Sequence, residues 1–317
     1  MISSELPHVR RVENRVLLRA VKRRRGHNVL DLISWCLAGL LTSGSAHALD
    51  PVPTDVRETN NWAGVMLGAR HSSYEELNNG LVPTLPQVLD AERGWLPALR
   101  VEGRLQRDLG SLRNTYVRAA VEYAFGDLTY DGRTQVTSFG GSVPVTRTSG
   151  AGLADLGVEA GVGIPFGSWW AITPLARYRY RHWTRLLDKG QPGAFKEAYY
   201  HQELAVGGLG QVVLSKGLVA GAAASLGGTV APGWALQPSG SSARLRLDLG
   251  NALVVRGELS LGYAISTKPR VHLVAGYELG TFAYGRSSTV RIGTVTAVEP
   301  DSRTIEQELR AGVAIGF

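Results

Sequence analysis

TIEQELRAGVAIGF, residues 304–317, is the stretch that decides the predicted fold, because its apolar and polar residues alternate one by one. One parity is apolar apart from Gln307 and holds Ile305, Leu309, Ala311, Val313, Ile315 and Phe317. The other parity holds Glu306, Glu308, Arg310 and small residues. A period of two predicts a β-strand with two different faces. A last strand that ends on an aromatic ring is typical of a membrane barrel, where the apolar parity faces lipid and the ring lies at the headgroup boundary. The alternative is a strand of a secreted β-sandwich.

The same alternation recurs along residues 62–317 and predicts ten strands, with eight or twelve as alternatives. Four short turns alternate with five longer polar segments, at 72–94, 127–150, 185–198, 231–251 and 287–303. Short turns at one end and long loops at the other are typical of an antiparallel up-and-down transmembrane β-barrel. We therefore predict an all-β fold of this kind, with both chain ends of the barrel on the periplasmic side.

The amino end has the parts of a secretory signal peptide over residues 1–48. A basic run, Lys22–Arg25, precedes an apolar segment from Val29 to Leu41, and Ser45–Ala48 offers a cleavage site after Ala48. The apolar segment is shorter than the roughly 20 residues that span a bilayer as a helix. The only cysteine, Cys36, lies inside it, so the mature chain would have no disulfide. Residues 49–61 then read as a periplasmic lead-in to the barrel.

Most of the net charge of +7 belongs to this leader. Residues 1–48 hold eight basic and three acidic residues, which leaves 26 basic and 24 acidic residues in 49–317. The mature chain is therefore nearly neutral, and we predict no nucleic-acid partner.

Aromatic residues gather near both ends of the predicted strands. Those near the turn ends are Trp62, Phe166, Trp169, Trp170 and Phe317, and those near the loop ends are Trp95, Phe125, Tyr180, Trp183, Tyr199, Tyr200 and Tyr284. Two such bands predict the aromatic girdles of a transmembrane barrel.

The signal peptide, the alternating segments and the Phe-terminated last strand resemble the small outer-membrane β-barrel superfamily of Gram-negative bacteria, of the 8–12-stranded size class. In that superfamily the barrel-insertion machinery reads an aromatic C-terminal strand, and the matching positions here are Leu309, Ala311, Val313, Ile315 and Phe317. The resemblance implies an exported protein of the cell outer membrane, with outer-membrane lipid and the insertion machinery as partners. It does not choose among adhesins, channels, structural barrels and barrel enzymes.

The polar parity of the strands predicts a lumen filled with charge. Its basic members are Arg100, Arg104, Arg118, Arg177, Arg179, Arg181, Arg256 and Arg310, and its acidic members are Glu102, Glu122, Asp155, Glu159, Glu203, Glu258, Glu278, Glu306 and Glu308. A barrel of eight to ten strands is little wider than its own side chains. Because an unpaired buried charge costs several kcal/mol, we predict a salt-bridged, largely plugged lumen. The alternative is an ion path with Arg177, Arg179 and Arg181 as an anion-favouring wall.

The sequence contains few of the residue patterns that an outer-membrane enzyme would need. Outer-membrane proteases of the ten-stranded class use paired Asp residues and an Asp–His pair near the rim, and neither D-x-D nor D-x-H occurs here. His182 and His201 flank a predicted loop that contains Asp188 and Glu197, a pair that could bind a metal or act as a base. The spacing is not diagnostic, and we predict no catalytic residue, metal or cofactor.

These observations favour an outer-membrane barrel with a structural or surface-contact role, carried by long extracellular loops with a ligand that the sequence does not identify. The first alternative is a narrow channel for small polar or anionic solutes, and the second is a rim-active outer-membrane hydrolase.

Overall fold

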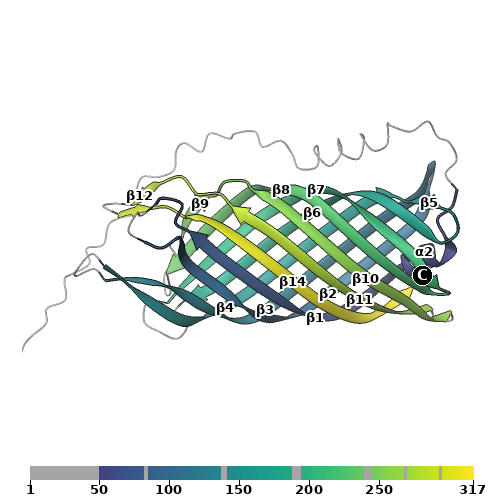
Figure 1. Cartoon of the computed structure of the whole chain (residues 1–317), viewed down its shortest axis with the longest axis horizontal. Coiled ribbons are helices and arrows are strands. Elements are labelled where there is room, and N and C mark those ends of the chain that lie inside the picture. Colours follow the sequence, from purple (N-terminus) through teal and green to yellow (C-terminus); the bar gives the residue numbers. More distant parts are fainter. Residues whose placement is uncertain are drawn as a thin grey trace, which may run out of the picture. The chain divides into compact units, whose positions relative to one another are not determined.

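The computed structural model describes residues 50–317 except 82–84, 137–140, 188–193, 239–243, 268–269 and 293–294. The predicted signal peptide lies outside the described residues. Within them, ten long antiparallel strands close into a barrel (Figure 1), which confirms the predicted fold class. Among the described residues no helix is long and apolar enough to cross a membrane.

Each long strand pairs with the next along the ring. The strands are β1 (Trp62–Leu77), β2 (Val88–Leu109), β3 (Leu112–Val136), β4 (Gly141–Val162), β6 (Trp170–Leu187), β7 (Phe195–Ser215), β8 (Leu218–Pro238), β10 (Leu253–Thr267), β11 (Arg270–Tyr284) and β14 (Asp301–Gly316). The last strand closes the ring, since β14 pairs with β11 on one side and with β1 on the other. In the β1–β14 pair, Val65 lies opposite Val313. Short strands flank the ring at β5 (Ile164–Phe166), β9 (Leu245–Asp248), β12 (Val290–Ile292) and β13 (Val295–Ala297).

The two parities of the strands face opposite sides of the barrel wall. On β14, the side chains of Leu309 and Ile315 are 63% and 65% exposed, whereas Glu308 and Arg310 are each 3% exposed. The closing strand therefore turns its apolar row outward and its ionic row inward. The other strands repeat this pattern, which gives the barrel an apolar outer band.

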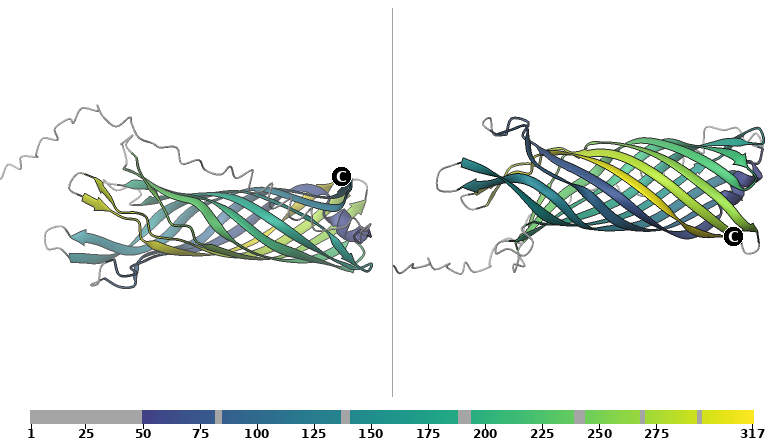
Figure 2. Two further views of the ribbon diagram at one scale, coloured as in Figure 1. Left: turned by 90° about the horizontal axis from the view of Figure 1, so that it is seen from above. Right: turned by 60° about the horizontal axis from the view of Figure 1, so that its bottom comes forward.

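The strands continue beyond this band at the end remote from the C-terminus (Figure 2). The segments 72–94 and 127–150, predicted as loops, are largely strand, because β1 runs to Leu77 and β3 and β4 stay paired as far as Val136 and Gly141. The prediction was wrong here because alternation stops where both faces of a ladder meet water, while the hydrogen bonds continue. Tight turns join the strands at the other end, with Gly110, Gly167 and Gly217 in the left-handed conformation that glycine adopts freely.

The aromatic girdles were only partly predicted. Trp95, Phe125 and Trp169 face outward, 54–60% exposed. By contrast four aromatic residues assigned to the girdles point into the barrel and are buried, namely Trp62, Trp183, Tyr199 and Tyr284. The prediction used the position of each ring along its strand and neglected its parity, which decides the face.

The lead-in, predicted as a short periplasmic segment, packs inside the turn end of the barrel and plugs it. Residues 54–59 form the short helix α2 (Thr54–Thr59), followed by Asn60, which is fully buried. The Asn60 side chain donates hydrogen bonds of 2.7 Å to the side-chain oxygens of Gln106 in β2 and Gln211 in β7. The turn end of the barrel is therefore closed by the chain's own amino-terminal segment.

Candidate functional site: a filled lumen and an acidic mouth

The predicted charge network lies inside the barrel. Sixteen of the seventeen predicted members are buried on the inner face, Arg104 is partly buried there, and all seventeen take part in ion pairs. The structure adds Arg70 of β1, a residue of the same parity, which pairs with Glu122, Asp155 and Glu308. With Arg70 included, nine guanidinium groups face nine carboxylates, and every guanidinium has a carboxylate oxygen at 2.9 Å or less.

The ion pairs join opposite walls of the barrel. Arg181 of β6 holds Asp155 of the adjacent β4 through two hydrogen bonds of 2.9 and 2.8 Å, and reaches across to Glu306 of β14 at 2.6 Å. Arg118 of β3 reaches Glu258 of β10 at 2.7 Å. Because these side chains cross the lumen, they fill it as well as neutralise it.

Little open space remains within this network. Two cavities that its side chains line each measure about 20 Å³, room for about one water molecule. Glycines on the inner parity make room for the guanidinium groups; a Cβ on Gly280 would lie 2.5 Å from Nη1 of Arg256. The barrel is thus packed at its centre like a protein core, with ions in place of aliphatic groups.

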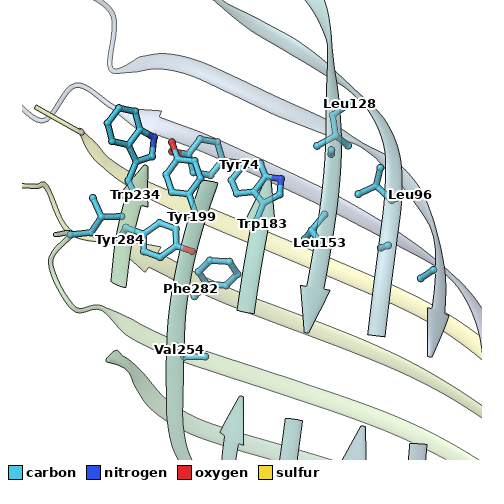
Figure 3. Packing of buried hydrophobic residues seen from close by; sticks show 14 of the residues in the cluster. Tyr74, Leu96, Leu128, Leu153, Trp183, Tyr199, Trp234, Val254, Phe282 and Tyr284 are labelled. Carbon is cyan, nitrogen blue, oxygen red and sulfur yellow. The ribbon is translucent and has the colours of Figure 1, made fainter. Parts of the chain in front are cut away.

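An aromatic cluster lies between this network and the loop end of the barrel (Figure 3). Its aromatic side chains come from strands on different sides of the barrel. The ring centroids of Trp183 and Tyr199 lie 5.1 Å apart and those of Tyr199 and Tyr284 lie 5.7 Å apart, and both pairs are stacked. Tyr74 of β1 meets Tyr199 of β7 through their hydroxyl groups, 3.2 Å apart. Alternation along β6 and β7, continued past the predicted strand ends, would have placed these rings inside.

A second ionic group, the acidic mouth, lies beyond the apolar band. At its centre Arg185 of β6 is 1% exposed and is surrounded by Glu76, Asp90, Glu92 and Glu197, at 3.4, 3.8, 3.4 and 3.0 Å. Four aromatic rings, of Tyr74, Tyr130, Trp183 and Tyr199, surround its guanidinium at 5.3–5.9 Å. Sequence reasoning missed this group because Arg185 was assigned to a loop, although it continues the inward parity of Arg177, Arg179 and Arg181.

A fifth carboxylate, Glu299, enters the acidic mouth from the connection between β13 and β14. The Tyr199 hydroxyl donates a hydrogen bond of 2.6 Å to it. Burial, with repulsion from Glu76 and Glu197, raises the pKa of Glu299 well above its ordinary value. Burial raises the pKa of Asp90 well above its ordinary value, and that of Glu197 to about 7, with Glu76 adding to both. Five carboxylates around one guanidinium therefore favour protonation at this end of the barrel.

The two candidate histidines do not form one site. His182 lies on the outward parity of β6, while His201 of β7 is 1% exposed on the inner face. His201 is held between the Tyr284 hydroxyl at 2.7 Å and Glu203 at 2.8 Å. The barrel wall separates the two rings, so they cannot act on one substrate as a pair.

The acidic mouth holds one pair of acids with the spacing of a carboxylate pair, and both acids contact the same cation. Asp90 and Glu92 stand two residues apart on β2 and face the same way, but both lie within 3.8 Å of the Arg185 guanidinium. Within the described part of the chain, no cluster of three or more His, Cys, Asp or Glu side chains has the geometry of a metal site.

Solved structures of other β-barrels are similar to this fold. The outer membrane protease OmpT from Escherichia coli is similar with a TM-score of 0.53 at 10% sequence identity, over 86% of this chain and 100% of OmpT. The fold is that of the small outer-membrane β-barrels. Two further barrels match with lower scores: the translocator domain of the autotransporter NalP from Neisseria meningitidis (TM-score 0.35, 13% identity, 91% of this chain and 97% of that one) and Neisserial surface protein A (0.27, 14%, 80% and 97%).

The likeness of this barrel to these proteins does not extend to their sequences. No protein-family model matches the chain, and no curated protein matches it. At these identities the shared fold says nothing of a shared activity, since one barrel architecture hosts many functions.

Proposed function

We propose that this protein resides in the outer membrane as a closed barrel, and that it serves a structural or surface-contact role through the strand extensions and connections at its loop end. Its partners would be outer-membrane lipid around the apolar band, the insertion machinery during assembly, and a ligand at the extracellular connections.

The filled lumen is the observation that carries this proposal. Nine paired guanidinium groups and nine carboxylates occupy the interior, and the cavities among them hold about one water each. A permeating ion would have to separate buried ion pairs, and breaking one such pair costs about 3–5 kcal/mol. The same observation disfavours the narrow channel. The wall between His182 and His201, together with the contacts of Asp90 and Glu92 to Arg185, disfavours the hydrolase.

Bilayer recording tests the proposal. The protein is first shown to be folded by a heat-modifiable band on an SDS gel, and is then added to a planar bilayer in concentrated KCl. We expect no conductance steps from the wild-type protein. A triple variant, Arg118→Ala, Glu258→Ala and Arg310→Ala, shortens three side chains that meet in the lumen, and is expected to give small conductance steps. Regular steps from the wild-type protein would overturn the closed-barrel function in favour of a channel.

A further inference from the structure

The outer wall of the barrel is hollowed near its loop end. A groove of about 450 Å³ lies there on the outward face of strands β3, β4, β6 and β7, against about 20 Å³ for each luminal cavity described above. Volumes of this order are usual for small-molecule sites. The floor of the groove is formed by β4, because Gly150 and Gly152 lie on the outward parity of that strand, whereas Asp155 faces the lumen. The groove therefore opens to the surroundings of the barrel and not to its interior.

The glycines of this floor differ from those on the inner face. Inner glycines such as Gly280 make room for guanidinium groups in the lumen, a reason that does not apply to Gly150 and Gly152 on the outside. Glycine weakens a strand, and within one it often marks a place where a ligand or another backbone approaches closely. Two glycines on the same face of β4 leave a strip of wall without side chains, between the longer side chains of β3 and β7.

One side of the groove is aromatic. Tyr123 and Phe125 of β3 are 51% and 54% exposed, and their rings stack with centroids 5.7 Å apart. The Tyr123 hydroxyl lies over the floor, since a Cβ on Gly152 would be 3.2 Å from it. Aromatic rings are enriched where a barrel wall meets lipid headgroups. This side of the groove therefore belongs to the aromatic girdle at the loop end.

The opposite side of the groove is basic. Lys196 of β7 is exposed and lines it. Gln237, the partner of Lys196 on β8, accepts a hydrogen bond of 2.9 Å from Nε of Arg244, so a second cation lies beside the lysine. The acid that lines the groove, Asp127, stands in register with Lys196 three strands away. Three strand spacings put roughly 14 Å of wall between the backbones of the acid and the lysine, which leaves the space over β4 and β6 between the two charges.

We propose that the groove binds one membrane lipid that carries a phosphate headgroup, with the phosphate at Lys196 and an acyl chain over the glycine floor against Tyr123 and Phe125. This inference rests on the proposed residence in the outer membrane, and it adds a defined ligand to the lipid around the apolar band. In a bilayer such a groove is filled by lipid, because an unfilled void loses the contacts of the atoms that line it.

The headgroup decides which lipid is bound. An acyl chain gains no hydrophobic energy by moving from neighbouring lipids to the wall, since both surroundings are apolar. Hydrogen bonds from an ammonium group to phosphate oxygens are stronger than those between neutral groups. Lys196 therefore supplies the selectivity, and the floor supplies the room for the chain.

Native mass spectrometry of the protein folded in detergent tests the groove. After a heat-modifiable band on an SDS gel has shown that the barrel is folded, it is titrated with dipalmitoyl phosphatidylglycerol, with the diacylglycerol that has the same chains, or with inorganic phosphate. We expect one phosphatidylglycerol to be retained per barrel. The diacylglycerol should bind about tenfold more weakly or less, since it lacks the charge-assisted hydrogen bonds. Inorganic phosphate lacks the chain and should not displace the lipid.

Three variants make the result specific. Lys196→Gln removes the charge and is expected to weaken retention of phosphatidylglycerol by about tenfold. Gly150→Leu keeps the lysine but fills the floor, and is expected to weaken retention as well. Lys216→Gln removes an exposed lysine from the turn between β7 and β8, at the other end of the barrel, and should behave as the wild type does.

The alternatives give different results. Equal retention of diacylglycerol and phosphatidylglycerol would mean non-specific lipid at the barrel surface, and displacement by inorganic phosphate would mean an anion site without a chain; either overturns the lipid site. It is also overturned if Lys196→Gln or Gly150→Leu retains the lipid as the wild type does. A folded barrel that retains no lipid removes this groove alone, whereas conductance steps from the wild-type protein remove the closed-barrel function alone.

Discussion

Arg181 shows how a single side chain stabilises this barrel. It is 1% exposed and neutralises Asp155 and Glu306 on two different walls. Arg181→Met removes the charge and leaves two carboxylates short of a cation, although Asp155 keeps Arg70. We expect the free energy of unfolding to fall by about 3–5 kcal/mol, as for other buried ion pairs that lose one partner. Urea titration of the protein folded into lipid vesicles measures the loss.

Arg303→Met is the matched control. Arg303 also pairs with one carboxylate, that of Glu75 at 2.7 Å, but its side chain is 59% exposed. Solvent screens such a pair, so its loss should change the free energy of unfolding by about 1 kcal/mol or less. Equal losses for Arg181→Met and Arg303→Met would mean that the luminal ion pairs contribute no more than surface pairs.

Strand parity predicted which face of the barrel wall most charged side chains lie on. It could not predict which carboxylate each arginine pairs with. Parity alone put Arg177, Arg179 and Arg181 on one face, because side chains alternate across a strand. Their partners come from β4, β10, β11 and β14, and which walls meet depends on the stagger of the closed ring. Arg185 was missed because a predicted loop has no parity.

At the scale of elements, α2 and Asn60 form a specific closure of the turn end. Asn60→Ala leaves the side-chain amides of Gln106 and Gln211 without this partner inside the barrel. Each buried polar group left unsatisfied costs about 1–3 kcal/mol. We expect amide exchange of residues 54–61 to rise about tenfold or more, since about 1.4 kcal/mol is a factor of ten. Mass-spectrometric hydrogen exchange of the folded protein measures it.

Glu58→Ala is the control for this element. Glu58 stands two residues away and pairs with Arg270 at 3.4 Å, with both side chains more than 40% exposed. Its loss should leave the exchange of 54–61 within about twofold to threefold of wild type, because an exposed pair contributes less than about 1 kcal/mol. If Glu58→Ala loosened the segment as much as Asn60→Ala, the closure would depend on surface charge and not on the buried amides.

The ends of the elements were the part of the fold that sequence reasoning predicted least well. Alternation of Leu99 and Val101 with Arg100 and Glu102 indicates a strand whose two faces have different surroundings, apolar on one side and polar on the other. Toward the tip of the β3–β4 pair, residues 143–148 are largely exposed on both faces, so the alternation fades although the strands stay paired. The lead-in was predicted as a short periplasmic segment, and its packing inside the barrel was not predicted, because its polar Asn60 and Asn61 gave no sign of partners that are distant in sequence.

At the scale of the whole barrel, the balance of acidic and basic side chains differs between the centre of the barrel and its loop end. The interior within the apolar band is neutral, with nine guanidinium groups and nine carboxylates, whereas the acidic mouth has five carboxyl groups around one guanidinium. A neutral interior suits a region that water and salt cannot reach, since buried charge is tolerated only when it is paired. An excess of carboxylates is tolerated at the mouth, where protons can be exchanged with solvent as pH changes.

Three obstructions lie in series along the barrel: the amino-terminal plug, the ion-pair network and the aromatic cluster next to the acidic mouth. The ion-pair network fills the lumen from wall to wall, so removal of the amino-terminal plug alone does not make a pore. A variant that lacks residues 50–59 is therefore expected to give no conductance steps in a planar bilayer, although its turn end is open. Heat-modifiability on a gel establishes that this variant is still folded. Steps as large as those of the triple variant Arg118→Ala, Glu258→Ala and Arg310→Ala would show that the plug was the real seal, and that the ion pairs leave a path that ions can follow.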